Sequence, residues 1–235
     1  MNKKIELFRN IPWTWKEFIS MLVLVLILVP FFIEFLLQNA LTNFFQNDLY
    51  AGTLTGFIMS IIFIGGLYFI AIRPKKLGWK EVGLQPFPIR YLGNIIGWTV
   101  FLIIISIMLS YILEFLFNIG TDNNKTESVQ SRLSTINILI AFVSAAIISP
   151  IYEEIFYRGF LYRWLRTKYG VLNGILVSSF IFMLVHIPTY NSLPYTFVSG
   201  VVFAWTYEKT KSVYPAMIIH GLFNGVSVVL MVVLA

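Results

Sequence analysis

The stretch LGNIIGWTVFLIIISIMLSYILEFLF occupies residues 92–117, and Glu114 is its single charged residue. A helix needs about 20 apolar residues to cross about 30 Å of hydrocarbon, so this stretch is long enough to span a membrane. Comparable apolar runs lie at about 18–37, 54–72, 136–168, 171–187, 194–207 and 213–234. The sequence therefore predicts an all-α, polytopic integral membrane helix bundle with about seven transmembrane or re-entrant helices, in a single membrane domain over residues 1–235.

The composition excludes several other classes of protein. Hydrophobic residues make up 58% of the chain and charged residues 12%, and the mean hydropathy is +0.80. Soluble domains are about half apolar and about a quarter charged. The absence of cysteine excludes disulfides, thiolate metal sites and thiol nucleophiles. The net charge of +6 comes from short blocks rather than from one basic face, so we expect a lipid bilayer and no nucleic acid as a partner.

The positions of the basic residues predict the topology. When the loops are assigned alternately to the two faces of the membrane, only Lys125 and Arg132 fall on the minority face. Because loops rich in Lys and Arg stay in the cytoplasm, we expect residues 1–17 to be cytoplasmic, and we place the protein in a bacterial plasma membrane. The segment 194–207 is short for a span, so a re-entrant helix fits it equally well and would put the C-terminus in the cytoplasm.

Aromatic and basic residues near the expected cytoplasmic face predict contacts with the membrane surface. Trp is enriched at membrane interfaces, and anionic lipids attract basic side chains. We therefore expect an interfacial belt formed by Trp13, Trp15, Trp79 and Trp164. We also expect anionic lipids around Arg163, Arg166 and Lys168.

The run Pro150-Ile-Tyr-Glu-Glu-Ile-Phe-Tyr-Arg-Gly159 places three charged residues in one apolar helix. Each charge costs about 2.5–3.5 kcal/mol at the centre of a membrane, so a role beyond packing is expected. Arg158 follows Glu154 by four residues, which puts the two side chains on one helix face as an ion pair. Successive helical residues point about 100° apart, so Glu153 is left to face a cavity. Pro150 predicts a kink beside it.

The two histidines of the chain, His186 and His220, both lie in apolar runs. Glu153 and His186 are nearly equally far along the chain from a turn near Gly170, so two antiparallel helices bring them to the same depth, facing each other. His220 and Asn224 are four residues apart and share one helix face, and Phe182 would pack beside His186 in the same way.

These side chains have a narrow chemical range. A carboxylate and imidazoles can deprotonate a water molecule, and an Asn amide can donate to a developing oxyanion, so the set predicts hydrolysis. A Glu with two His is also the ligand set of many hydrolytic zinc sites. The residues alone leave open whether Glu153, His186 and His220 bind zinc or act without a metal.

Three motifs in order, Glu153-Glu154-x-x-x-Arg158, Phe182-x-x-x-His186 and His220-x-x-x-Asn224, resemble those of the CAAX protease and bacteriocin-processing (CPBP) family, also called Abi proteins. The resemblance covers roughly residues 140–230, which would form the catalytic core. It implies an intramembrane endopeptidase of metallo- or glutamate type that acts on a peptide or membrane protein. Glu153 would activate water with His186, and His220 and Asn224 would complete the site. Glu154, Arg158 and Phe182 would support it.

Two other classes of function fit the same residues. A non-catalytic membrane scaffold or bacteriocin-immunity-type protein would keep the motifs for packing, since buried polar pairs can fix helix register. A small transporter would use the carboxylates as proton carriers, but the sequence shows no inverted repeat of its polar helix. Glu34 and Glu114 lie near outer helix ends, and we interpret them as structural.

Overall fold

The computed structural model describes residues 8, 10–120, 127 and 134–233, and every regular element among them is helical. Five helices are long and apolar enough to cross a membrane: Trp15–Phe45, Asp48–Lys75, Ile89–Phe117, Thr135–Leu184 and Tyr214–Val233. The fourth bends at Gly170, whose φ of +86° interrupts it, and a further helix, α10 (Leu193–Thr210), is not among the five. The predicted all-α membrane bundle is confirmed, and about seven passes fit this arrangement.

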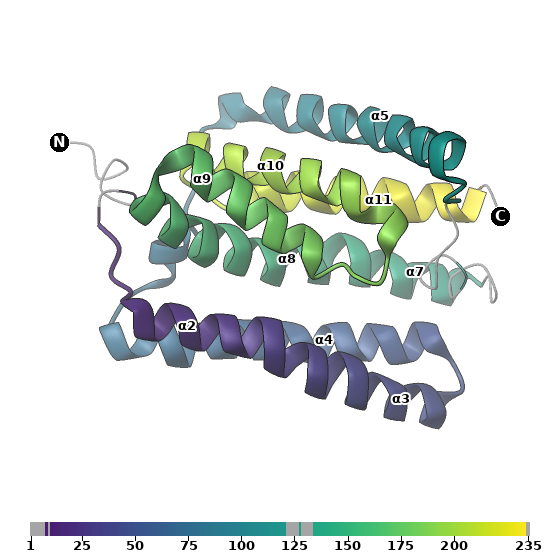
Figure 1. Cartoon of the computed structure of the whole chain (residues 1–235), viewed down its shortest axis with the longest axis horizontal. Coiled ribbons are helices and arrows are strands. Elements are labelled where there is room, and N and C mark those ends of the chain that lie inside the picture. Colours follow the sequence, from purple (N-terminus) through teal and green to yellow (C-terminus); the bar gives the residue numbers. More distant parts are fainter. Residues whose placement is uncertain (1–7, 9, 121–126, 128–133, 234–235) are drawn as a thin grey trace.

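The helices form three groups that run roughly parallel in Figure 1. One group contains α2 (Trp15–Val23), α3 (Gln38–Phe45) and α4 (Asp48–Gly66). The central group contains α7 (Thr135–Val143), α8 (Ser149–Glu154), α9 (Arg163–Leu184), α10 and α11 (Tyr214–Val233). In Figure 1, α5 (Leu92–Phe117) lies on the other side of the central group from α2–α4. Within the long helices, wider π-helical turns cover Leu24–Leu37, Leu67–Ile72, Ser144–Ile148 and Ile155–Tyr162.

Side-chain caps fix where the first helices begin. The Thr14 hydroxyl accepts a hydrogen bond from the Lys16 amide, and Glu17 reaches back to the Thr14 amide at 2.7 Å. This reciprocal arrangement satisfies amide groups that a helix start leaves without partners. Asn47 caps α4 in a similar way by accepting from Leu49 at 3.0 Å. The cap lets α3 and α4 form a tight hairpin.

The Trp residues contradict part of the predicted interfacial belt. Trp13 and Trp164 are both buried. The Trp13 indole donates to the Ala71 carbonyl at 3.0 Å, and the Trp164 ring stacks on Phe18 with ring centroids 3.7 Å apart. Trp15 is half exposed, as a belt residue would be. The belt prediction was wrong for these two positions because Trp13 packs against Phe160 and Trp164 packs against Phe18 inside the protein.

The basic residues near Trp164 also lie differently from our prediction. Arg163 is buried and donates to the Glu81 carboxylate at 2.9 Å, and Arg166 forms an ion pair with Glu208 at 3.1 Å. Lys168 is exposed and Arg166 is partly exposed, so the expectation of anionic lipids was wrong for Arg163 and stays a prediction for the other two. The two arginines form ion pairs with acidic residues that are far away in the sequence, Glu81 and Glu208. The basic residues Lys3, Lys4, Arg9, Lys125 and Arg132 lie outside the described residues.

Candidate active site

Pro150 shapes the helix that carries the two glutamates. It has no N–H group, so carbonyl groups in the turn before it lose their helical donor. One of them, the Ala145 carbonyl, accepts a hydrogen bond of 2.9 Å from the Asn224 side-chain amide on α11. The neighbouring Ala146 carbonyl lies directly against Gly221, where a side chain would not fit. A small residue and an amide on α11 thus hold this helix at the point where its own hydrogen bonding is interrupted.

Glu154 is the centre of a buried polar network. Its Oε1 atom accepts from Arg158 at 3.1 Å, which confirms the predicted ion pair, and is 2.9 Å from Nδ1 of His220. Glu154, Arg158 and His220 are all buried. Since a carboxylate oxygen that already binds a guanidinium acts as an acceptor, Nδ1 of His220 is the donor. Neutral His220 therefore carries its proton on Nδ1 and presents Nε2 as a base.

Glu153 lies on the other side of the His220 ring. Its Oε2 atom is 4.0 Å from Nε2 of His220, and its side chain is 14% exposed, whereas that of Glu154 is fully buried. Successive positions on one helix thus give two carboxylates different surroundings. The separation of 4.0 Å is too long for a direct hydrogen bond, but one water molecule can bond to both atoms.

His186 is held at the end of α9 in a similar tautomer. Its Nδ1 atom is 2.7 Å from the Phe182 carbonyl, and because a carbonyl only accepts, Nδ1 carries the proton. The Phe182 ring contacts both imidazoles, with its centroid 4.9 Å from that of His186 and 5.9 Å from that of His220. The predicted packing of Phe182 beside His186 is confirmed. Both histidines therefore contact one buried aromatic ring.

Phe203 and Gly200, which were not predicted from the sequence, complete the network. Phe203 stacks on the His220 ring at 4.8 Å, and Arg158 lies over Phe203 at 5.1 Å and over Phe182 at 4.3 Å. Arg158 also donates to the Gly200 carbonyl at 3.3 Å. The neighbouring small residues of α9 and α10 were the available signal, because such residues let membrane helices approach closely. A Cβ atom on Gly200 would lie 2.9 Å from that of Ser179.

A catalytic zinc ion needs three protein ligands close together. Within residues 8, 10–120, 127 and 134–233, no three His, Asp or Glu side chains are grouped closely enough to hold one. Glu153, His186 and His220 therefore do not form a ready zinc site in this arrangement.

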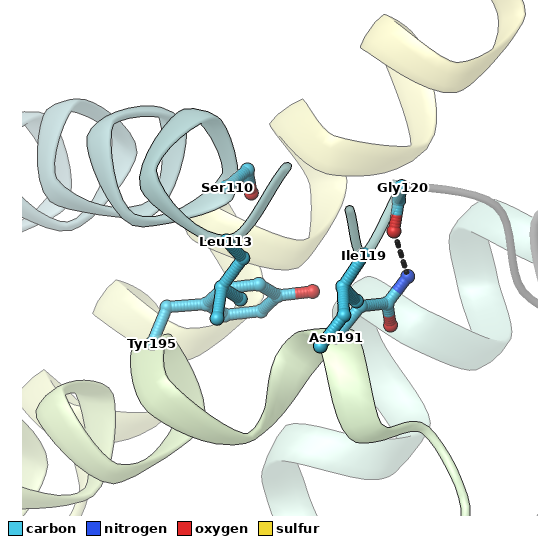
Figure 2. Close-up of a pocket in the computed structure, with 6 residues that line it drawn as sticks. All are labelled: Ser110, Leu113, Ile119, Gly120, Asn191 and Tyr195. Atoms are coloured by element: carbon cyan, nitrogen blue, oxygen red, sulfur yellow. Dashed lines mark hydrogen bonds between the residues drawn. The ribbon is translucent and has the colours of Figure 1, made fainter. Parts of the chain in front are cut away.

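A small pocket is lined by none of these residues. It lies between the end of α5 and the start of α10 and is lined by residues that include Ser110, Tyr195 and Asn191 (Figure 2). The Asn191 amide donates to the Gly120 carbonyl at 3.1 Å. The pocket has a volume of about 30 Å³, which is enough for about one water molecule. It is therefore too small for a peptide.

Comparisons with known proteins place the region of these residues in a family match. Residues 135–226 match the family described as Type II CAAX prenyl endopeptidase Rce1-like. The chain is 28% identical over 116 residues to "Putative membrane peptidase YdiL" of Bacillus subtilis (strain 168), covering 49% of this chain and 46% of that relative. It is 27% identical over 169 residues to "UPF0177 protein YbdI" of Lactococcus lactis subsp. lactis (strain IL1403), covering 70% of this chain and 90% of the relative. No solved structure matches. The resemblance predicted from the three motifs is confirmed, and the match with YdiL spans about half of that protein.

Proposed function

We propose that this chain is an intramembrane endopeptidase that hydrolyses a peptide bond in a peptide or membrane protein, in keeping with the match of residues 135–226 to the Rce1-like CAAX endopeptidase family. One observation carries the proposal. The His220 ring lies between two successive carboxylates, with Nδ1 at 2.9 Å from Glu154 and Nε2 at 4.0 Å from Glu153. A base and an oriented imidazole beside it are parts that hydrolysis without a covalent intermediate requires.

Glu153 is the proposed general base. It takes a proton from the attacking water as the water oxygen bonds to the carbonyl carbon of the substrate. When the carbon–nitrogen bond breaks, the same proton passes from Glu153 to the leaving amine. The partial exposure of Glu153 suits this role, because the group must meet a substrate. His186, with its unprotonated Nε2 in the neutral form, is the proposed partner of Glu153 in orienting the water.

His220 and Asn224 are the proposed groups on the oxyanion side. Nδ1 of His220 is held by Glu154, and Nε2, when it carries a proton, would donate to the developing negative charge. Asn224 has two side-chain N–H groups, and its bond to Ala145 uses one of them. Glu154 and Arg158 act as positioning residues, since Glu154 orients His220 and Arg158 balances the charge of Glu154.

A glutamate-type reaction is our proposal, because the donor set offers no grouped metal ligands in the described part of the chain. Zinc binding by Glu153, His186 and His220 would require these side chains to move together. If a metal did bind, it would lower the pKa of a bound water and polarise the substrate carbonyl. Chelation of metals separates the two types of reaction.

A second candidate is the non-catalytic membrane scaffold. The observation that favours it is the bond from Asn224 to Ala145, together with the buried pair of Glu154 and Arg158, because these contacts stabilise helix packing without any chemistry. In a scaffold, Glu153 would have no function of its own. The two candidates therefore differ most at Glu153.

The proposed function is tested with the full-length protein reconstituted into proteoliposomes. Wild type, Glu153→Gln and a matched control, Glu114→Gln, are incubated with a library of hydrophobic peptides, and products are identified by mass spectrometry. Glu114 is exposed on α5, so its change should leave activity intact. We expect cleavage by wild type and by the control, and loss of cleavage in Glu153→Gln. Equal cleavage by all three proteins would refute the role of Glu153.

The orientation in the membrane is also a proposal. The concentration of basic residues in alternate loops supports a cytoplasmic N-terminus in a bacterial plasma membrane. A cysteine introduced at Lys80 should then react with a membrane-impermeant maleimide only after cells are opened. Labelling in intact cells would show that position 80 faces the outside of the cell, and the orientation would then be the opposite of the one proposed.

A further inference from the structure

A second, larger cavity is lined by none of the proposed catalytic residues. It has a volume of about 370 Å³, within the range of small-molecule sites. Its walls come from α5, α9 and α10, and they are apolar side chains that include Trp98, Phe101, Ile175, Val201 and Trp205. An apolar cavity of this size, open along the side of a membrane protein, suits a hydrocarbon chain.

The cavity lies near the basic end of the bundle. Trp98 is six residues from the start of α5, or about 9 Å along the helix. Ile175 follows the bend at Gly170 by five residues, and Trp205 precedes the end of α10 by five. All three therefore lie within about two turns of the same end, where a lipid headgroup and the first part of its chain would be found.

Lys209 adds a positive charge at the rim of the cavity. Its ammonium group lies 4.1 Å from the centroid of the Trp205 ring, which itself lines the cavity. Lys209 is exposed, and no carboxylate lies within ion-pair distance of it in the portion of the chain that is described. The neighbouring Glu208 pairs with Arg166 and Lys211 instead. Lys209 is thus left as a cation beside an apolar cavity.

We propose that this cavity is a binding site for an anionic phospholipid, with one acyl chain against Trp98, Phe101 and Trp205 and the phosphate paired with Lys209. The apolar walls select the chain, and the unbalanced charge selects an anionic headgroup over a zwitterionic one. A basic residue at a membrane surface contributes about fivefold to the binding of an anionic lipid. The site is independent of the proposed peptidase activity.

The test measures lipid binding to the delipidated full-length protein in detergent by native mass spectrometry. Phosphatidylglycerol and phosphatidylcholine with the same acyl chains are titrated separately. We expect wild type to prefer phosphatidylglycerol, and Lys209→Gln to reduce that preference about fivefold. The matched control is Lys168→Gln, because Lys168 is also exposed and lies 5.9 Å from a tryptophan ring, that of Trp164, which does not line the cavity. The control should keep the preference.

A cavity-filling variant tests the chain-binding part separately. Val201→Phe places a ring in the cavity and should weaken the binding of both lipids by a similar factor. Equal affinity of wild type for the two lipids would overturn the proposal, and so would a preference unchanged in Lys209→Gln. Binding of a lipid-modified peptide with no binding of either phospholipid would also overturn it, and would instead assign the cavity to a substrate.

Discussion

Nδ1 of His220 donates a 2.9 Å hydrogen bond to the Glu154 carboxylate, although the two residues are 66 positions apart in the chain. Arg158 donates to the same oxygen from one helical turn away. This relationship separates the roles of the two neighbouring glutamates. Glu154 holds the network together inside the protein, and Glu153 faces the other nitrogen of the ring.

Glu154→Gln should destabilise the protein more than Glu153→Gln does. The change leaves Arg158 as a buried charge without its partner, which typically costs about 3–5 kcal/mol. Thermal unfolding in detergent, followed by tryptophan fluorescence, compares the two variants with wild type. Glu153→Gln should unfold close to wild type while losing activity by about 10²–10⁴-fold, the usual contribution of a general base. Equal loss of stability in both would contradict the division of roles.

Asn224→Ala should lower stability by about 1–3 kcal/mol, because it leaves the Ala145 carbonyl without its donor beside Pro150. The measurement is denaturant unfolding of the purified protein. Ser227→Ala is the matched control on α11, since among the described residues that hydroxyl bonds back to Phe223 in its own helix. If both variants unfold like wild type, the hydrogen bond from Asn224 to Ala145 does not stabilise the packing of α11 on the helix that carries the glutamates.

Gly159→Ala should disturb the contact between the π-helical turns Ile155–Tyr162 and the segment Trp79–Val82. A Cβ atom at this position would collide with the Val82 carbonyl, and overpacking of this kind typically costs about 1–3 kcal/mol. Gly97→Ala on α5 has open space around it and should be neutral or slightly stabilising. Limited proteolysis of the segment in the two variants reports the difference. Equal protection in both would show that the contact is not tight.

Acid should weaken the basic end of the bundle through Glu208. Burial alone would raise the pKa of Glu208, but hydrogen bonds from Arg166, Lys211 and Tyr162 hold that pKa below its usual value of 4.5. Because the folded-state pKa is lowered, its stabilising contribution is fully present above pH 4.5 and is lost as the pH falls through the folded-state value. The free energy of unfolding, measured from pH 6 downward, should therefore fall in wild type. It should fall less in Glu208→Gln. Identical pH profiles would contradict this.

Removal of metals should leave peptidase activity within about twofold of its starting value. The described carboxylates and imidazoles are not grouped as a metal site, so Glu153 acts directly on water in our account. The measurement is cleavage before and after dialysis against a strong chelator, followed by addition of zinc. Loss of activity that zinc restores would mean that Glu153, His186 and His220 move together around an ion.

Much of the fold could be predicted because hydropathy alone marks apolar helices. The span 92–117 coincides with α5, and the bend at Gly170 lies where the sequence places a turn. The short segment 194–207 corresponds to α10, which is indeed outside the five candidate spans. Helical spacing also predicted the pair of Glu154 and Arg158 correctly. These features depend only on neighbours along one helix.

The contacts between helices could not be predicted in the same way. Nothing in the sequence near Trp13 indicates that its indole binds the Ala71 carbonyl, and the bond between His220 and Glu154 depends on how α11 packs on α8. The facing of Glu153 and His186, expected from equal distances to a turn, stays a prediction. The roles of Glu153, His186, His220 and Asn224 in catalysis likewise depend on activity measurements.

The most direct measurement of the central claim maps new peptide termini in the membrane fraction of cells by quantitative proteomics. Four strains are compared: wild type, Glu153→Gln, Glu114→Gln and a deletion. The account predicts termini that are present in wild type and Glu114→Gln and absent from the other two strains, and these termini would identify the substrates. A Glu153→Gln strain that matches wild type while the deletion differs would contradict the peptidase and support the scaffold.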